Sequence, residues 1–530
     1  MSLIAVETLS LTIHGKPILR DVDLTIAPRE IFGLVGESGS GKSMTALAIM
    51  GLLPPGAQAA GRIGFEGADL LTLPEARMNA LRGARIGMIF QEPMTALNPL
   101  MRIGDQVAET LRIHTGMGRA EALAVARDKL DRVGLPAPRF GLELYPHELS
   151  GGQRQRVAIA LAIALRPALL IADEPTTALD VTTQAEVLDL LESLVDQDGM
   201  ACLLITHDLA VIADRAERVA VMKAGAVVET GPTEAVFRAQ THPYTRALFA
   251  AAAHVPDAPV LPPPGPQPIL SVDNAVRIYR TPRPRPFAPP GEVRAVDGVS
   301  LAIGPGESLG LVGESGCGKS TLSRAILGLD PLQGGRILLD GAPVEAGRRM
   351  PRALRAKVQA VFQDPYGSFD PRWRVDRLVA EPFHLTGRPA DWQDRVAAAL
   401  VEVGLTPEDR LKYVHEFSGG QRQRLAIARA LIIRPELIVL DEAVSALDVR
   451  VRAQVLDLLT RLRETHGLSY LFISHDLTVV RAITDRVAVM RAGRIVETGP
   501  TAQVLTTPRE SYTRRLIDAA PEIPPDWRTP

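Results

Sequence analysis

The chain has 530 residues, 46% hydrophobic and 23% charged, an ordinary composition for globular domains, and its length alone predicts about three or four of them. A formal net charge of −2 excludes a global basic field that would recruit nucleic acid or acidic lipid. The two cysteines, Cys202 and Cys317, are too few for a disulfide framework and fit a reducing cytoplasm. Met1–Thr12 lack a signal-peptide pattern and no apolar run approaches about 18 residues, so we expect neither a signal peptide nor a membrane span.

The first part of the chain shows both strand-like and helix-like patterns. Residues 1–30 alternate apolar and polar side chains, which predicts antiparallel strands around a turn. The apolar run Ile31–Val35 precedes a glycine-rich loop and a helix-like segment over Met44–Gly51. A stretch rich in proline, glycine and alanine, 52–67, returns to a short strand, and Ala120–Val133 has helical periodicity.

Two short apolar runs end beside polar side chains. Residues 168–173 end in an aspartate, and residues 201–206 end just before His207. Such runs are typical of buried parallel strands, which deliver side chains to the carboxyl edge of a sheet. We therefore expect Asp173 and its neighbour Glu174 to lie at that edge.

A glycine-rich loop that fits G-x-x-x-x-G-K-[ST] occurs twice, each time between an apolar run and a helix-like segment. Its glycines let backbone N–H groups converge on phosphate oxygens, at the positive end of the following helix. The lysine would reach the β- and γ-phosphates, and the final serine would bind Mg²⁺. The expected phosphate-binding residues are Gly36, Ser38, Gly39, Gly41, Lys42, Ser43, Gly313, Ser315, Gly316, Gly318, Lys319 and Ser320.

The second half of the chain repeats the motif order of the first. Each loop is followed by Gln-Glu/Asp-Pro, Ser-Gly-Gly-Gln, an acidic pair and Thr/Ser-His-Asp. The acidic pair follows the serine by 24 residues in both halves (174−150 and 442−418), and the histidine follows the pair by 33 (207−174 and 475−442). Two homologous domains explain these spacings. We expect a first domain at 1–253, a Pro-rich linker at 254–268, a second domain at 269–520, and a loosely held Pro-rich tail at 521–530.

With these motifs, each half resembles the nucleotide-binding domain of an ATP-binding cassette (ABC) transporter, over nearly the whole chain. The resemblance is carried by Leu149–Arg156 and Phe417–Arg424, which read LSGGQRQR and FSGGQRQR. It implies an α/β fold with two tandem P-loop domains, each with a mainly parallel core sheet, an antiparallel β subdomain and a helical subdomain. It also implies ATP hydrolysis, with ATP and Mg²⁺ bound.

The resemblance assigns a role to each paired motif. The expected catalytic residues are the water-polarising glutamates and the switch histidines, Glu174, His207, Glu442 and His475. The expected Mg²⁺ ligands are Ser43, Gln91, Asp173, Ser320, Gln363 and Asp441. The signature residues expected to meet a γ-phosphate are Ser150, Gly151, Gly152, Gln153, Ser418, Gly419, Gly420 and Gln421. Asp180 and Asp448 match the D-loop that crosses between the sites.

The same resemblance implies that neither loop forms a hydrolytic site alone. Site one would join Lys42 to Ser418–Gly420 of the second half. Site two would join Lys319 to Ser150–Gly152 of the first half. We therefore expect two composite ATP sites at the interface of the halves.

The two halves differ where the adenine base would stack. Aligning Val6 with Val272 places Tyr279 opposite Ile13. An aromatic ring gains about 1 kcal/mol from stacking, whereas Ile13 offers only apolar contact unless neighbouring His14 swings in. We expect weaker adenine stacking in the first site.

Further paired segments resemble the peptide/nickel importer subfamily. Gln91–Pro99 is echoed by Gln363–Pro371, and His242–Arg246 by Ser511–Arg515. A fused pair most resembles the ATPase of microcin C/peptide-type and glutathione-type importers. This implies two transmembrane permeases as partners, a periplasmic peptide-binding protein met indirectly, no nucleic acid, and a peripheral place on the cytoplasmic face of the inner membrane. Because the C-terminal region has no cysteine, we expect no iron–sulfur cluster.

Two alternative functions compete with this interpretation. A fused sugar-importer ATPase would share the chemistry but not these paired segments. A soluble ABC ATPase acting in translation would need a basic interdomain arm, whereas the linker here is proline-rich and almost uncharged. The Pro/Arg-rich insert at 281–291 is expected to be a solvated loop.

Overall fold

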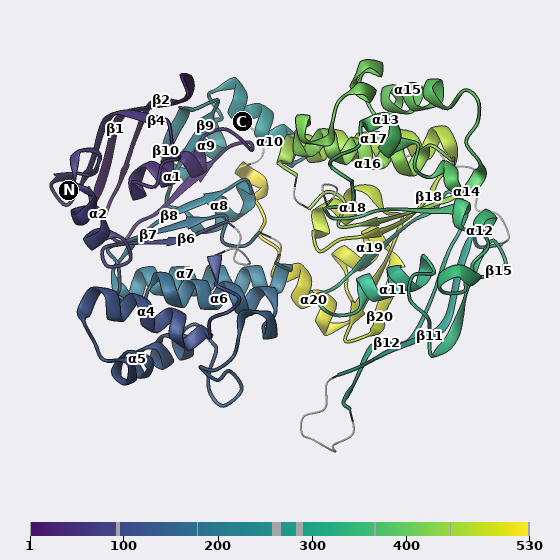
Figure 1. The fold of residues 1–530 in the computed structure, drawn as a ribbon, viewed down its shortest axis with the longest axis horizontal. Helices are drawn as coiled ribbons and strands as arrows, with labels where there is room; N and C mark the ends of the chain where they lie inside the picture. Colours follow the sequence, from purple (N-terminus) through teal and green to yellow (C-terminus); the bar gives the residue numbers. More distant parts are fainter. Residues whose placement is uncertain are drawn as a thin grey trace.

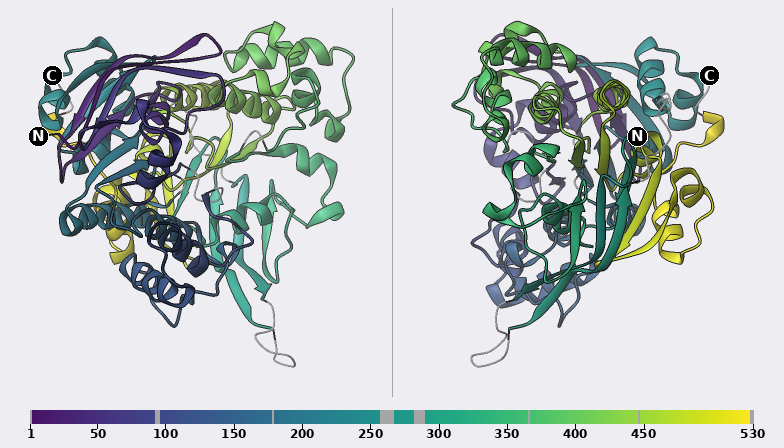
Figure 2. Two further views of the ribbon diagram at one scale, coloured as in Figure 1. Left: turned by 60° about the vertical axis from the view of Figure 1, so that its left-hand side comes forward. Right: turned by 90° about the vertical axis from the view of Figure 1, so that its right-hand side faces the viewer.

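A computed structural model describes residues 2–91, 96–177, 179–256, 267–281, 290–364, 367–445 and 447–527. The two halves of the chain lie side by side, the first drawn in purple to teal and the second in green to yellow (Figure 1). Both termini lie on the first half (Figures 1 and 2). Most of the expected linker, 257–266, and most of the Pro/Arg-rich insert, 282–289, lie outside the described residues.

The first half contains an antiparallel sheet and a mainly parallel sheet. Its strands are β1 (Ile4–Ile13), β2 (Lys16–Ile26), β3 (Ile31–Val35), β4 (Ala57–Phe65), β5 (Ala68–Asp69), β6 (Ile86–Ile89), β7 (Leu169–Asp173), β8 (Ala201–Thr206), β9 (Arg218–Lys223) and β10 (Ala226–Pro232). The four-stranded antiparallel sheet has the order β2-β1-β4-β5. The six-stranded sheet has the order β10-β9-β3-β8-β7-β6, and all its neighbours are parallel except β9 and β10.

The second half repeats this pair of sheets. Its strands are β11 (Leu270–Arg280), β12 (Glu292–Ile303), β13 (Ser308–Val312), β14 (Gly334–Leu339), β15 (Ala342–Pro343), β16 (Val358–Val361), β17 (Leu437–Asp441), β18 (Ser469–Ile473), β19 (Arg486–Arg491) and β20 (Arg494–Pro500). The orders are β12-β11-β14-β15 and β16-β17-β18-β13-β19-β20. The matching orders confirm the predicted fold of two tandem α/β domains.

The helices cover the sheets and form a separate group at one end of each half (Figure 1). In the first half they are α1 (Lys42–Met50), α2 (Glu75–Leu81), α4 (Ile103–Thr115), α5 (Arg119–Arg132), α6 (Gly151–Ala162), α7 (Val181–Asp198), α8 (Leu209–Arg215), α9 (Thr233–Ala239) and α10 (Pro243–Ala252). In the second half they are α11 (Lys319–Ile326), α12 (Arg352–Lys357), α13 (Val375–Val379), α14 (Phe383–Thr386), α15 (Trp392–Glu402), α16 (Gly419–Leu431), α17 (Val449–His466), α18 (Leu477–Ile483), α19 (Thr501–Thr506) and α20 (Ser511–Asp518).

Strand β7 shows why the mainly parallel sheet has an apolar sequence. Leu169 and Ile171 pack into the core cluster shared with the antiparallel sheet. Leu170 and Ala172, which point to the opposite face, pack into the cluster shared with the helices. The strand is buried on both faces, as its continuous apolar run predicts.

The proline-rich C-terminal segment packs on the first half, so the prediction of a loosely held tail is wrong for residues 521–527. Ile523 is 8% exposed and belongs to the core cluster of the first half. Trp527 lies edge-on to Phe237 of α9, with 6.2 Å between the ring centroids, and Asp526 pairs with Arg238. Burial of these two apolar side chains outweighs the flexibility that the prolines and the chain end suggest.

Replacing Ile523 by alanine tests this packing. We expect Ile523→Ala to lower the stability of the first half by about 2 kcal/mol, because it removes a buried aliphatic side chain and leaves a cavity. Hydrogen exchange should rise in α9 and stay unchanged in β13. Ile113→Ala is the matched control, since Ile113 is 72% exposed; equal effects of the two substitutions would contradict the assignment.

Candidate functional site

The first phosphate loop, between β3 and α1, is shaped by glycine and by a buried lysine. Gly41 has a φ of 107°, and a Cβ at this position would lie 2.6 Å from the Leu19 side chain. Lys42 is only 5% exposed. Its Nζ donates to the carbonyl oxygens of Gly36 at 2.7 Å and Glu37 at 3.0 Å. The loop therefore closes around the lysine side chain.

The second phosphate loop, between β13 and α11, has the same construction. Gly318 has a φ of 112°, and a Cβ there would lie 2.0 Å from the carbonyl oxygen of Ala295. Lys319 Nζ donates to the carbonyl oxygens of Gly313 at 2.7 Å and Glu314 at 2.9 Å. Both loops thus present their backbone in one shape, which depends on glycine at the position before the lysine.

The aspartate that ends each acidic strand faces the helix after its loop. Ser43 Oγ donates to Asp173 Oδ1 at 3.2 Å, which brings together two of the predicted Mg²⁺ ligands. In the second half, Asp441 accepts instead from Ser323 Oγ at 3.3 Å, and Ser320 is exposed. The two halves therefore differ in the hydroxyl group that meets the aspartate.

Three side chains gather at the carboxylate of Glu174. Gln91 Nε2 donates to Glu174 Oε2 at 2.9 Å, and Thr177 Oγ1 donates to the same oxygen at 3.0 Å. His207 Nδ1 lies 3.3 Å from Glu174 Oε1. The predicted glutamine, glutamate and histidine therefore meet at the edge of the sheet where β7 and β8 end.

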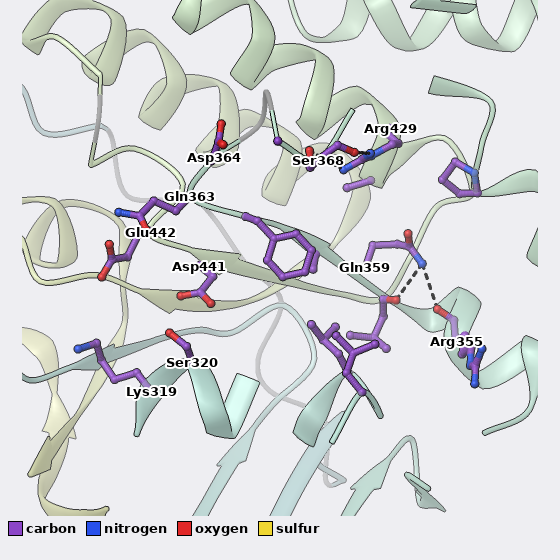
Figure 3. A pocket seen from close by; sticks show the side chains of 18 of the residues that line it. Lys319, Ser320, Arg355, Gln359, Gln363, Asp364, Ser368, Arg429, Asp441 and Glu442 are labelled. Carbon is purple, nitrogen blue, oxygen red and sulfur yellow. Dashed lines mark hydrogen bonds between the residues drawn. The ribbon is translucent and has the colours of Figure 1, made fainter. Parts of the chain in front are cut away.

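The second half brings together the corresponding residues. His475 Nδ1 lies 3.4 Å from Glu442 Oε1. Figure 3 shows Gln363 beside Glu442, with Asp441, Lys319 and Ser320 nearby. They line one end of a cavity of about 980 Å³. Asp180 of the first half also lines this cavity.

Burial and neighbouring groups shift the pKa values of the two acidic side chains of each pair in opposite directions, up for the aspartate and down for the glutamate. Burial raises the pKa of Asp173 to about 6, with a further increase from the charge of Glu174. Burial also acts to raise the pKa of Glu174, but the hydrogen bond and charge of His207, with Thr177 and Lys42, hold it at about 2. Glu174 is therefore ionised at neutral pH and able to accept a hydrogen bond from water.

Each Ser-Gly-Gly-Gln segment forms the start of a helix. Ser150 caps α6: its Oγ accepts from Gln153 N at 3.3 Å, and Gln153 Oε1 accepts from Ser150 N at 2.9 Å. Ser418 and Gln421 form the same capping box at the start of α16. The following glycines, Gly151 and Gly419, are exposed. Each helix therefore offers an accessible, positively polarised N-terminus.

The glycine at the second position of each of these helices allows close helix packing. A Cβ at Gly152 would lie 2.4 Å from the Thr183 side chain of α7. A Cβ at Gly420 would lie 2.3 Å from the Val451 side chain of α17. Glycine is thus needed for packing at this position, independently of any ligand.

The second phosphate loop contacts the D-loop of the first half. Ser315 N donates to Asp180 Oδ2 at 3.2 Å, and Thr182 Oγ1 donates to Glu314 Oε1 at 3.3 Å. Asp180 also caps α7 by accepting from Thr183 N at 3.1 Å. One carboxylate therefore holds both a helix start and the loop of the other half.

The first phosphate loop contacts the second half through a different pair. Arg450 donates to Glu37 Oε1 at 2.9 Å. Burial lowers the pKa of Lys42, and the negative charge of Asp448 is one of those acting against that shift. Across the described ranges, however, no hydrogen bond joins Ser38 to Asp448, or Ser150–Gly152 to the second loop. The D-loops thus approach both loops, but they bind them unequally.

Tyr279 lies on β11 with one face of its ring covered. The Arg277 guanidinium carbon is 4.5 Å from the ring centroid, and Tyr279 Oη donates to Asp330 at 3.0 Å. The side chain is 36% exposed. Ile13 occupies the equivalent end of β1 and presents no ring. The structure therefore retains the difference between the halves that the sequence indicates.

Sequence reasoning missed the support that each phosphate loop receives from the C-terminal part of its own half. Tyr244 of α10 and Tyr512 of α20 place their hydroxyl groups on these loops. The paired segments that contain them were visible in the sequence as subfamily markers. Their spacing from the loops gave no sign of contact.

Comparison with known proteins gives two families. The ABC transporter family profile matches residues 19–177 and 296–445. The profile of the oligopeptide/dipeptide transporter C-terminal region matches residues 228–270 and 496–530. Each match occurs once in each half of the chain, in the same order.

Full-length relatives and a solved structure are also similar to the chain. The "Peptidoglycan transport ATP-binding protein YejF" of Agrobacterium fabrum is 47% identical over 98% of this chain and 96% of its own length. The "Glutathione import ATP-binding protein GsiA" of Salmonella paratyphi A is 44% identical over 99% of this chain and 91% of its own. A structure of "the ATP-binding cassette MJ0796 bound to ADP and Pi" is 30% identical over 43% of this chain and 98% of its own, with a TM-score of 0.40.

The unequal D-loop contacts predict unequal effects of removing them. Asp180→Ser keeps a good helix cap but removes the carboxylate that accepts from Ser315 N. We expect faster amide hydrogen exchange across Gly313–Lys319. Asp448→Ser is the matched variant in the other half and should leave exchange across Gly36–Lys42 unchanged. Equal changes in the two loops would contradict the asymmetry.

Proposed function

The chain belongs to the ABC transporter family, and from this we propose that it is the ATP-hydrolysing subunit of an importer for peptides or peptide-like compounds. One observation carries the proposal: the oligopeptide/dipeptide transporter C-terminal region follows both cassettes. The names of the two relatives support it, because peptidoglycan transport and glutathione import both concern compounds that contain short peptides. The cargo itself does not follow from the fold.

We propose that ATP is hydrolysed at two composite sites between the halves. Lys42 and Lys319 would hold the β- and γ-phosphates. Glu174 and Glu442 would each accept a hydrogen bond from the attacking water. The exposed N-termini of α6 and α16 would each meet the γ-phosphate held by the opposite loop. The contact between Asp180 and Ser315 supports this arrangement, because it already brings a first-half element to the second phosphate loop.

The oxygen-rich surroundings of each loop fit a magnesium ion. Mg²⁺ binds oxygen ligands and keeps some of its ligands as water and phosphate oxygens, so few protein groups are needed. Ser43, Gln91 and Asp173 would hold it in site one, and Ser320, Gln363 and Asp441 in site two. The 3.2 Å contact between Ser43 and Asp173 supports the first set. The bound ion would neutralise charge on the phosphates.

We further propose two transmembrane permeases as partners, a periplasmic peptide-binding protein met only through them, and a place on the cytoplasmic face of the inner membrane. Within the ranges described above, no helix is long and apolar enough to span a membrane. Phe90 and Phe362, which precede Gln91 and Gln363, are 42% and 38% exposed and offer apolar surface to a partner. Because the net charge is −2, we propose no nucleic acid as a partner. An iron–sulfur cluster is usually held by four cysteines, whereas the chain has two, Cys202 and Cys317, in different halves, so we propose no such cluster.

Affinity purification of the full chain from its membranes tests the proposal. We expect two integral membrane proteins to co-purify, and deletion of the gene to abolish uptake of labelled short peptides. Loss of growth on sugars alone would support the sugar-importer alternative. Association with ribosomes would support the translation alternative.

Substitution of the catalytic glutamates tests the hydrolytic sites. Glu174→Gln combined with Glu442→Gln keeps the shape and removes the charge, so ATP should still bind while turnover falls by a factor of about 100 or more.

Lys319→Ala should lower turnover at site one as well as at site two, if the halves close together. Full turnover at site one in Lys319→Ala would contradict coupled closure.

The difference at the adenine position predicts unequal affinities. Tyr279→Ala should weaken ATP binding at site two about fivefold, since an aromatic stack contributes about 1 kcal/mol. Ile13→Ala removes only apolar contact and should weaken site one by less. Equilibrium binding to variants with a single working site measures both, and equal losses would count against the difference.

A further inference from the structure

Each half places a tyrosine hydroxyl on its own phosphate loop. Tyr244, 3% exposed, accepts a hydrogen bond from Glu37 N at 3.1 Å. Tyr512, 2% exposed, accepts one from Glu314 N at 3.1 Å. Burial raises the pKa of both hydroxyl groups to about 12, so both are neutral at physiological pH.

The peptide unit that the tyrosine holds is the one that the loop lysine also holds. The Gly36 carbonyl accepts from Lys42 Nζ at 2.7 Å, and the N–H of the same peptide bond, that of Glu37, donates to Tyr244. Rotation of this peptide would break both hydrogen bonds. The tyrosine and the lysine therefore fix one plane from its two ends, and the second loop repeats the arrangement.

The tyrosine is itself held in place. Glu229 of β10 accepts from the backbone N–H groups of Thr241 at 3.0 Å and His242 at 3.2 Å, and from Thr245 Oγ1 at 2.5 Å. Lys223 Nζ lies 5.0 Å from the centre of the Tyr244 ring. These contacts fix the start of α10 relative to the sheet edge.

The second half builds the same support with different residues. Glu497 of β20 accepts from Arg509 N at 2.8 Å and Glu510 N at 3.2 Å, just before α20. The Arg491 guanidinium carbon lies 5.0 Å from the centre of the Tyr512 ring. Arg491 thus takes the place that Lys223 has in the first half, at the same distance from the tyrosine ring. The same arrangement therefore occurs in both halves with different side chains.

The loop residue fixed by each tyrosine also bridges the halves. The Glu37 side chain binds Arg450, and the Glu314 side chain binds Thr182. The N–H of each glutamate is therefore held by its own C-terminal region, while its carboxylate contacts the opposite half. A change in either contact would alter the position of the loop backbone.

We propose that Tyr244 and Tyr512 are positioning residues, each of which orients the first peptide of its phosphate loop for ATP and ties that loop to its C-terminal region. This inference rests on ATP occupying the two loops, as proposed above. Tyr→Phe removes only the hydroxyl and leaves the N–H of the glutamate without its partner. The loop peptide is then free to turn away from the geometry that binds phosphate.

Site-resolved photolabelling of the full chain with 8-azido-ATP, followed by peptide mapping, tests the proposal. Tyr244→Phe should raise the concentration that gives half-maximal labelling at the first site about tenfold, the effect of leaving one partly buried donor unpaired, and leave labelling at the second site unchanged. Tyr512→Phe should do the converse. Turnover at saturating ATP should be unchanged, because the loop would hold ground state and transition state alike.

Two controls separate positioning from loss of structure and from failure of the ATP sites. Tyr470→Phe removes a buried hydroxyl that donates to the Leu459 carbonyl at 2.8 Å, away from the loop, and should lower the unfolding temperature without changing labelling. Lys42→Ala should abolish labelling at the first loop; retained labelling would overturn the proposed ATP site. Unchanged labelling in Tyr244→Phe, or equal weakening of both loops by it or by Tyr470→Phe, would overturn the positioning role.

Discussion

The burial of one ammonium group in each phosphate loop is the constraint on which the rest of each half depends. An isolated buried cation costs several kcal/mol of desolvation. Lys42, 5% exposed, recovers this through two backbone carbonyls and the nearby charges of Glu174 and Asp173. Those carboxylates are in reach only because β3 lies beside β8 and β8 beside β7, so that their carboxyl ends share one edge. The order of the parallel strands is therefore what places the carboxylates that stabilise the buried lysine.

The two halves are built alike but their sites are unequal. Asp173 meets Ser43 in one site, and Asp441 meets Ser323, three residues after Ser320 on the same helix, in the other. A symmetric dimer of identical chains presents the same surface twice and cannot differ in this way. Fusion in one chain removes that restriction, so each site is able to change without changing the other.

Local motifs were predictable from sequence because each concerns contiguous residues. A glycine loop and an apolar run ending in an acid each carry their own pattern, and the structure places them as predicted, after β3 and at the end of β7. Contacts between distant residues were not predictable. Glu37 meets Tyr244 across 207 positions and Arg450 across 413, and neither separation has a periodicity that sequence alone reveals. The prediction for the tail was wrong for a related reason. Its prolines suggested mobility, whereas Ile523 and Trp527 pack against distant residues of the first half.

The packing of the C-terminal segment on the first half has a consequence for the order in which the protein matures on the ribosome. Domains generally fold as units during synthesis, with the N-terminal unit first. Here the core of the first half includes Ile523, which is translated after the whole second cassette. Part of the apolar surface of the first half therefore stays uncovered until the second cassette and the segment around Ile523 have been translated. A chain that is truncated before Ile523 lacks part of the core of its first half, although every strand of that half has been made.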